Sequence, residues 1–212
     1  SEALKAEVLE LEEKWAAIKP EFDQAPDKTK MSELHKKVES YVVRCEEIAE
    51  HLAQDTGIEG EHDVVLVAEL GMESQRLAAL YLMKAWDVAD PNYEEEVQQI
   101  VDDTEKIYNE LMAEDEKFVS AAIKEKLKTF EEHFISFGVM AKSKSGRFMP
   151  TAAEKNASAI YEEVKEILKM EQKLVEGNIS GYFMPVADEK EAGRLFEVFS
   201  EIIYVSEEEV LS

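Results

Sequence analysis

The sequence contains few of the residues that build disulfides, sheets or tight turns. Its single cysteine, Cys45, excludes an internal disulfide, and the neighbouring Glu46 and Glu47 disfavour a reactive thiolate. Eight glycines and five prolines interrupt 212 residues, and alternation of β-branched residues is almost absent. No apolar run approaches the roughly 18 residues that cross a bilayer, and the amphipathic start does not resemble a signal peptide. We therefore expect a mature secreted form or an excised soluble domain.

Basic residues are also scarce. Lys and Arg number 24 against 48 Asp and Glu, which gives a formal charge of −24 and a pI near 4.5. Such a surface repels phosphate backbones and anionic headgroups, so nucleic-acid binding and direct membrane binding are disfavoured. A small anionic ligand has to be captured locally, against the field of the whole chain.

Apolar residues instead recur at steps of three and four between Glu and Lys, the pattern of amphipathic helices. This periodicity predicts an all-α protein, an elongated helical bundle with more than roughly 70% helix, against a norm near one third. The expected helices span about 2–24, 30–55, 62–89, 92–113, 115–142, 150–176 and 187–203.

A weak internal similarity indicates two tandem helical modules. Residues 11–18, LEEKWAAI, resemble residues 130–137, FEEHFISF, and each segment is followed by a polar turn and another helix. A shift of about 118 residues then places Arg76 on Arg194. The predicted division is a first module at 1–113 and a degenerate second module at 114–212, with one continuous domain, 1–212, as the alternative.

Residues 64–86, VVLVAELGMESQRLAALYLMKAW, place one arginine inside a long apolar helix. An isolated guanidinium there is costly unless an anion meets it. Glu73 lies one turn before Arg76 and Glu69 two turns before, so an ion pair within the helix is one interpretation. The other is a ligand, because the fork of arginine suits bidentate recognition. In either case we expect Arg76 to be partly buried and held by several acceptors.

The segment from Gly71 to Ala78, GMESQRLA, followed by YLMKA, resembles the R-M-x-S-Q-R-x-A box of PilJ-type sensor domains. These are the N-terminal ligand-binding regions of type IV pilus methyl-accepting chemotaxis transducers, and nitrate/nitrite sensor kinases carry a related box. The segment DPNY at 90–93 with its acidic helix, and FMP at 148–150, are similar to later landmarks of the family. Gly71 stands where the family box carries its first arginine, which weakens the case for nitrate.

The resemblance implies a non-catalytic, periplasmic or extracellular sensor domain of a chemotaxis or signal-transduction receptor. Its ligand would be small and anionic or polar, and a homodimer is possible because the nitrate site forms between two subunits. The ligand-binding residues implied by the box and the repeat are Met72, Ser74, Gln75, Arg76, Tyr81 and Arg194.

Other chemistries lack a pattern in the sequence. No Ser, Cys or His constellation indicates nucleophilic catalysis, and no glycine-rich phosphate loop is present. The Glu-x-x-His spacing of Glu59 and His62 has no second copy, so a di-iron site is disfavoured. We expect no enzyme activity, no metal and no cofactor. The alternative function is a non-signalling helical scaffold, or a secreted binding protein, that docks a protein partner.

Overall fold

The computed structural model describes residues 2–179 of the chain. Six helices account for about 80% of it, and no strand occurs within that range, which confirms the all-α prediction. The helices are α1 (Glu2–Phe22), α2 (Met31–Thr56), α3 (Glu61–Ala85), α4 (Tyr93–Ala113), α5 (Ala121–Ala141) and α6 (Pro150–Ile179). The helix predicted at 187–203 and Arg194 lie outside the described residues.

The two helix boundaries that differ most from the prediction, the end of α3 and the start of α5, do so for local reasons. α3 ends at Ala85 rather than at residue 89, because Asp87 adopts a left-handed conformation with φ of 60°. The amide of Val88 then donates to the carbonyl of Met83 and that of Asp87 to the carbonyl of Lys84, which is the Schellman arrangement of a helix end. α5 begins at Ala121 rather than at residue 115, because the Ser120 side chain accepts from the Ile123 amide and caps the helix.

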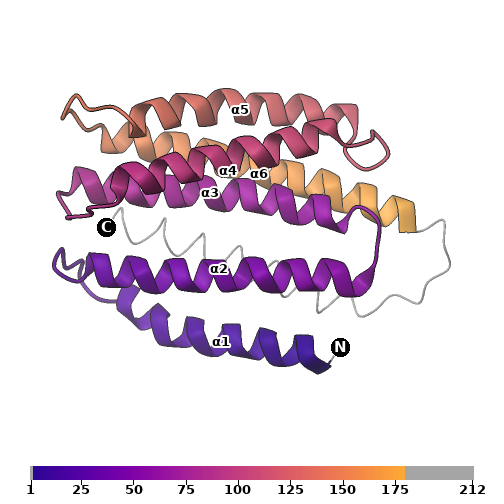
Figure 1. The fold of residues 1–212 in the computed structure, drawn as a ribbon, viewed down its shortest axis with the longest axis horizontal. Helices are drawn as coiled ribbons and strands as arrows, with labels where there is room; N and C mark the ends of the chain where they lie inside the picture. The colour runs from indigo at the N-terminus through magenta and orange to yellow at the C-terminus, as the bar shows by residue number, and fades with distance from the viewer. Residues whose placement is uncertain (1, 180–212) are drawn as a thin grey trace.

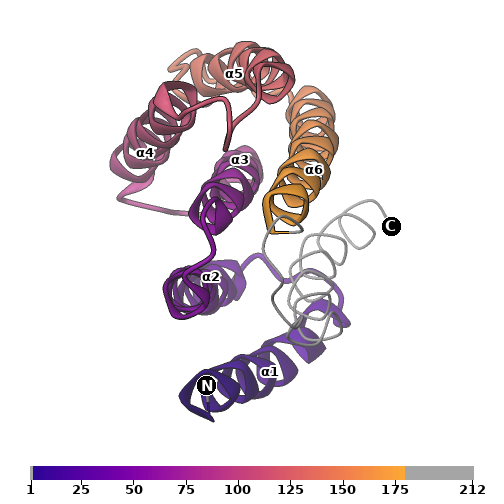
Figure 2. The ribbon, with the colours of Figure 1, turned by 90° about the vertical axis from the view of Figure 1, so that its right-hand side faces the viewer.

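α3 is the central helix of the fold. Viewed end on, α4, α5 and α6 surround it on three sides and α2 lies against the fourth (Figure 2). Among the described helices, α1 packs mainly on α2, and the six helices run roughly along one long axis (Figure 1). Buried residues lie on most sides of α3, as expected of a helix that is apolar nearly all round.

The apolar residues form two separate cores. Helices α3 to α6 share one core, which includes the fully buried Leu70, Leu77, Phe130 and Phe137. The α1–α2 hairpin has its own smaller core around Tyr41, with Cys45 also buried there. Burial raises the pKa of Cys45 to about 11, in line with an unreactive thiol.

The boundary between these cores falls between α2 and α3, whereas the larger core runs continuously across residue 113. The two segments of the predicted repeat, 11–18 and 130–137, lie in α1 and α5, and each helix is followed by a packed partner, α2 or α6. The division into modules at 1–113 and 114–212 stays a prediction.

Gly71 lets α3 approach α6 closely. A Cβ atom at this position would lie 2.9 Å from Cγ1 of Val164 on α6, which is closer than real carbon contacts. The position that carries the first arginine of the family box is therefore closed by a neighbouring helix in this chain. In the described residues, no helix is long and apolar enough to cross a membrane.

Gly71→Ala is expected to destabilise the fold by about 1–3 kcal/mol, since overpacking a filled core outweighs the helix propensity gained. Gly138→Ala on α5 is the matched control, because its Cβ would meet Val101 at an ordinary 3.4 Å. That variant is expected to be neutral or slightly stabilising. Urea unfolding of both variants measures the difference, and adding Val164→Ala to Gly71→Ala should recover stability. Equal effects of the two glycine substitutions would contradict the close packing.

Candidate functional site

Arg76 joins α3 to α2 through a bidentate ion pair. Its Nε donates to both carboxylate oxygens of Glu39 at 3.0 and 3.2 Å, and Nη2 donates to Glu39 Oε2 at 2.7 Å. Nη1 donates to Glu73 Oε1 at 2.8 Å. The side chain is 24% exposed, so the expected partial burial with several acceptors is confirmed.

Glu73 is one of the two predicted partners, whereas the second is Glu39 of α2 rather than Glu69. Glu69 lies seven residues before Arg76, and a carboxylate on the adjoining helix approaches the guanidinium more directly. Glu39 is 37 residues away in the sequence, so no local pattern indicates it. This pair bridges the hairpin and the four-helix core at the level of the arginine.

A polar pocket of about 240 Å³ adjoins this bridge. It is formed where α2, α3 and α4 meet, and its lining residues are Glu46, Glu69, Glu73, Arg76, Asp103, Lys106 and Ile107. Four carboxyl groups thus face two basic groups. The volume suits a small molecule rather than a drug-sized ligand.

Three of the carboxyl groups that line the pocket have raised pKa values. Burial, and next the charge of Glu69, raise the pKa of Glu46 to about 7. Burial, followed by the charges of Glu50 and Glu73, does the same to the pKa of Glu69. Burial also raises the pKa of Glu73 to about 7, because the pull of Arg76 in the opposite direction is the smaller effect. Burial acts to lower the pKa of the Arg76 guanidinium, but the hydrogen bonds and charges of Glu39 and Glu73 together outweigh it and raise the pKa, so the group stays charged.

Of the residues implied by the family box, only Arg76 lines this pocket. Ser74 is buried and donates to the Leu70 carbonyl of its own helix, and Gln75 donates to the Ala157 carbonyl of α6. Tyr81 is buried against α5 and accepts from the Met149 amide. Met72 is half-buried and does not line the pocket.

Only some of the residues that line the pocket could be identified from the sequence. Glu69, Glu73 and Arg76 are spaced by four and three, so their common face of α3 is visible in the sequence. Glu46 on α2 and Asp103 and Lys106 on α4 come from other helices, and nothing local associates them with Arg76. In residues 2–179, no group of three or more His, Cys, Asp or Glu side chains is placed to hold a metal ion.

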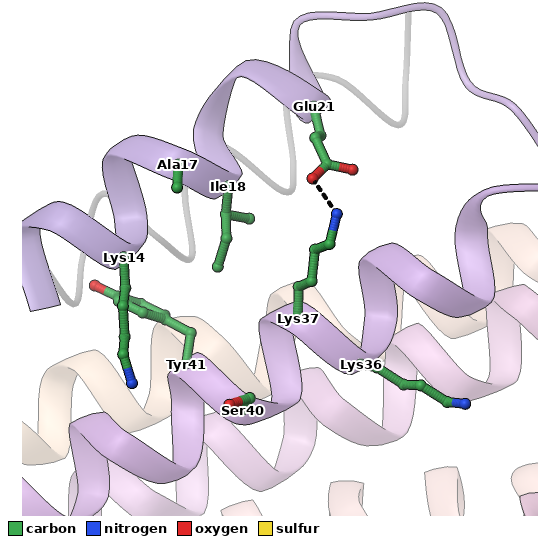
Figure 3. A pocket seen from close by; sticks show the side chains of 8 residues that line it. All are labelled: Lys14, Ala17, Ile18, Glu21, Lys36, Lys37, Ser40 and Tyr41. Atoms are coloured by element: carbon green, nitrogen blue, oxygen red, sulfur yellow. Dashed lines mark hydrogen bonds and ion pairs between the residues drawn. The ribbon is translucent and has the colours of Figure 1, made fainter.

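A larger hollow of about 440 Å³ lies between α1 and α2, away from Arg76. Its lysines make it the one locally basic pocket of the two (Figure 3). Lys37 is paired with Glu21 at 2.8 Å across it, Lys14 with Glu10 at 3.1 Å, and Lys36 points away from α1 (Figure 3). Because Lys14 and Lys37 are already paired with carboxylates, this pocket is less suited to an anion than its lysines alone would indicate.

No family model matches the chain, and comparison with curated proteins and with solved structures returns no significant match. The resemblance to PilJ-type sensor domains therefore rests on the sequence segments that carry it, chiefly the one around Arg76.

Proposed function

We propose that this chain is a ligand-binding sensor domain, working by binding rather than catalysis, and that its site is the polar pocket beside Arg76. One observation carries the proposal. Glu73 lines the pocket and is 4% exposed; one of its oxygens accepts from Arg76, and the other is buried with no hydrogen-bond partner among residues 2–179. A buried acceptor left unpaired costs about 1–3 kcal/mol, which a bound ligand would recover.

The position of the pocket suits a sensor. Its walls come from the hairpin helix α2 and from α3 and α4, so a ligand there would contact both the hairpin and the four-helix unit. A ligand that binds one relative placement of these units more tightly shifts the population toward that placement. The shift would pass along α1 and α2 as a small movement of packed helices.

The resemblance of the Arg76 segment adds the wider setting of the proposal: an extracytoplasmic domain of a chemotaxis or signal-transduction receptor. The sequence predicts a ligand that is either anionic or polar, and the charge of the pocket favours a polar ligand over an anion. All three nitrogens of Arg76 already donate to carboxylates, and carboxyl groups outnumber bases in the pocket. A simple anion would meet repulsion from at least one unpaired carboxylate there.

Because every nitrogen of the Arg76 guanidinium already donates to a carboxylate, a second candidate function is also favoured. If the ion pairs with Glu39 and Glu73 only hold the hairpin in place, the chain is a helical scaffold whose partner docks on its helix faces. The two functions differ in whether a small molecule moves the hairpin.

A distance measurement separates them. Spin labels at Leu9→Cys on α1 and Ile135→Cys on α5 use two exposed positions, and the buried Cys45 should not react. A thermal-shift screen of nitrate, carboxylates, amino acids and amines supplies the ligands. For a sensor, we expect at least one ligand to raise the melting temperature and to change the distribution of distances between the labels.

The variant Glu46→Gln tests whether the effect arises in the pocket, because Glu46 lines it and makes no ion pair with any described residue. The ligand effect should be reduced in this variant. Ligands that stabilise both proteins equally, or an unchanged distance distribution at saturation, would favour the scaffold.

A further inference from the structure

The carboxyl groups of the Arg76 pocket are unequally satisfied. Arg76 donates to Glu73, and Gln99 donates to both oxygens of Asp103 at 2.9 Å. Among the described residues, the side chains of Glu46 and Glu69 have neither an ion pair nor a hydrogen bond. The unpaired acceptors are therefore Glu46, Glu69 and the second oxygen of Glu73.

These three carboxyl groups come from two helices that converge on the pocket. Glu69 and Glu73 are one turn apart on α3, and Glu46 approaches from α2. Each group acts on another electrostatically: the charge of Glu69 acts on Glu46 and that of Glu73 on Glu69. Arg76 donates to only one of the two oxygens of Glu73. A ligand that supplies positive charge and several N–H donors would satisfy all three.

We infer that the ligand is a small organic cation whose ammonium group donates hydrogen bonds to Glu46, Glu69 and Glu73. The inference rests on the proposed function and specifies its ligand class. An ammonium carries three N–H donors and no acceptor, which matches the number of carboxyl groups with unpaired oxygens in the lining of this pocket. Charge-assisted hydrogen bonds of this kind are about twice as strong as neutral ones.

A bare metal ion is a less suitable ligand for these carboxyl groups than an ammonium. The described residues contain no group of carboxylates or histidines arranged closely enough to ligate one. An ammonium tolerates the longer and less regular arrangement because its donors rotate on a flexible carbon stem. The apolar part of the ligand would lie against Ile107, the hydrophobic residue of the lining.

Binding should be linked to the release of protons. The three carboxyl groups hold protons in part near neutral pH, since burial raises the pKa of each to about 7. A cation binds their ionised forms, so it displaces these protons. Affinity should therefore increase by roughly tenfold or more between pH 6 and pH 8, which is opposite to the trend for an anion.

Isothermal titration calorimetry with 1,4-diaminobutane, in about 0.15 M NaCl to screen surface charge, tests the inference. We expect saturable binding at one site. Glu69→Gln should weaken it by about tenfold or more while preserving the fold, because it removes an unpaired charge. Glu132→Gln is the matched control, an exposed glutamate on α5 with the same loss of charge, and it should bind as the parent does.

Three other probes determine which property of the ligand the pocket recognises. Magnesium chloride has the charge of the diamine without N–H donors, tetramethylammonium is organic but lacks them, and sodium nitrate is an anion. Equal binding of magnesium or tetramethylammonium, or equal weakening in both variants, would overturn the inference. Nitrate binding that disappears in Lys106→Ala would overturn it and leave the proposed function standing. If none of the probes binds and the thermal-shift screen finds no ligand, both fail.

Discussion

Replacing Arg76 with alanine is expected to lower the free energy of unfolding by about 2–3 kcal/mol at pH 8. Removing one partner of a fully buried pair costs about 3–5 kcal/mol, and the partial exposure of Arg76 and Glu39 reduces this figure. The substitution leaves Glu73 buried without a counter-ion and removes the bridge between the α1–α2 hairpin and α3. Urea unfolding followed by circular dichroism measures the loss.

The effect should depend on pH in a defined direction. The pKa of Glu73 is already raised to about 7, and the loss of Arg76, which lowers it, should raise it further. At pH 5 this carboxyl is protonated in the folded parent, so the ion pair contributes less and the loss should be smaller. Adding Glu73→Gln to the Arg76→Ala variant should recover part of the stability at pH 8.

Arg44→Ala is the control for this experiment. Arg44 lies on α2 and also makes ion pairs with three glutamates, but two of these carboxylates are largely exposed. Exposed pairs contribute little, so this variant should unfold much closer to the parent. Similar losses for Arg44→Ala and Arg76→Ala would mean that the Arg76 bridge has no special role in holding the hairpin.

Replacing Glu171 with methionine is expected to stabilise the protein by about 3 kcal/mol at pH 8 and by about 1 kcal/mol at pH 5. Glu171 lies on α6 and is completely buried, and within the described part of the chain neither of its oxygens has a hydrogen-bond partner. Burial, and then the charge of Asp63 on α3, raise its pKa to about 8. Methionine has a similar volume and makes no demand for a polar partner.

The pH dependence follows from the raised pKa. The folded state keeps a proton on Glu171 that the unfolded chain releases near pH 4.5, the ordinary value for glutamate. The parent should therefore lose stability as pH rises from about 4.5 to 8, and the gain from Glu171→Met should grow over the same range. Thermal unfolding at pH 5 and pH 8 measures both values.

Glu176→Met provides the control, since it makes the same change at an exposed position of α6. We expect no gain in stability from it at either pH. A Glu171→Met variant that is less stable than the parent would show that the buried carboxyl has a partner, and a gain independent of pH would contradict the raised pKa.

The helices were predictable because their apolar residues repeat at helical spacing. In α4, the buried Val97, Ile100, Ile107 and Leu111 keep steps of three, four and seven. The end of α3 was not predictable, because it depends on a left-handed conformation at Asp87, which is not a glycine. Propensity gives little indication of such a residue, whereas the backbone hydrogen bonds that follow it make the end stable.

The candidate site was predictable only where it lies on one helix. The charge of Arg76 in an apolar segment indicated a partner, and Glu73 was visible one turn earlier. Glu39 and Glu46 reach the same place from α2, and that placement depends on how the hairpin packs against α3. Ser74 and Tyr81 have polar groups that suggest a site, yet both are satisfied within the core by backbone groups.

A crystal structure determined after soaking with 1,4-diaminobutane tests the central claim most directly. We expect ordered non-protein density in the pocket between α2, α3 and α4, with a nitrogen within hydrogen-bonding distance of Glu46, Glu69 and Glu73 and the Arg76–Glu39 pair beside it. Density for the amine only on outer helix faces, with no ligand in the pocket, would contradict it.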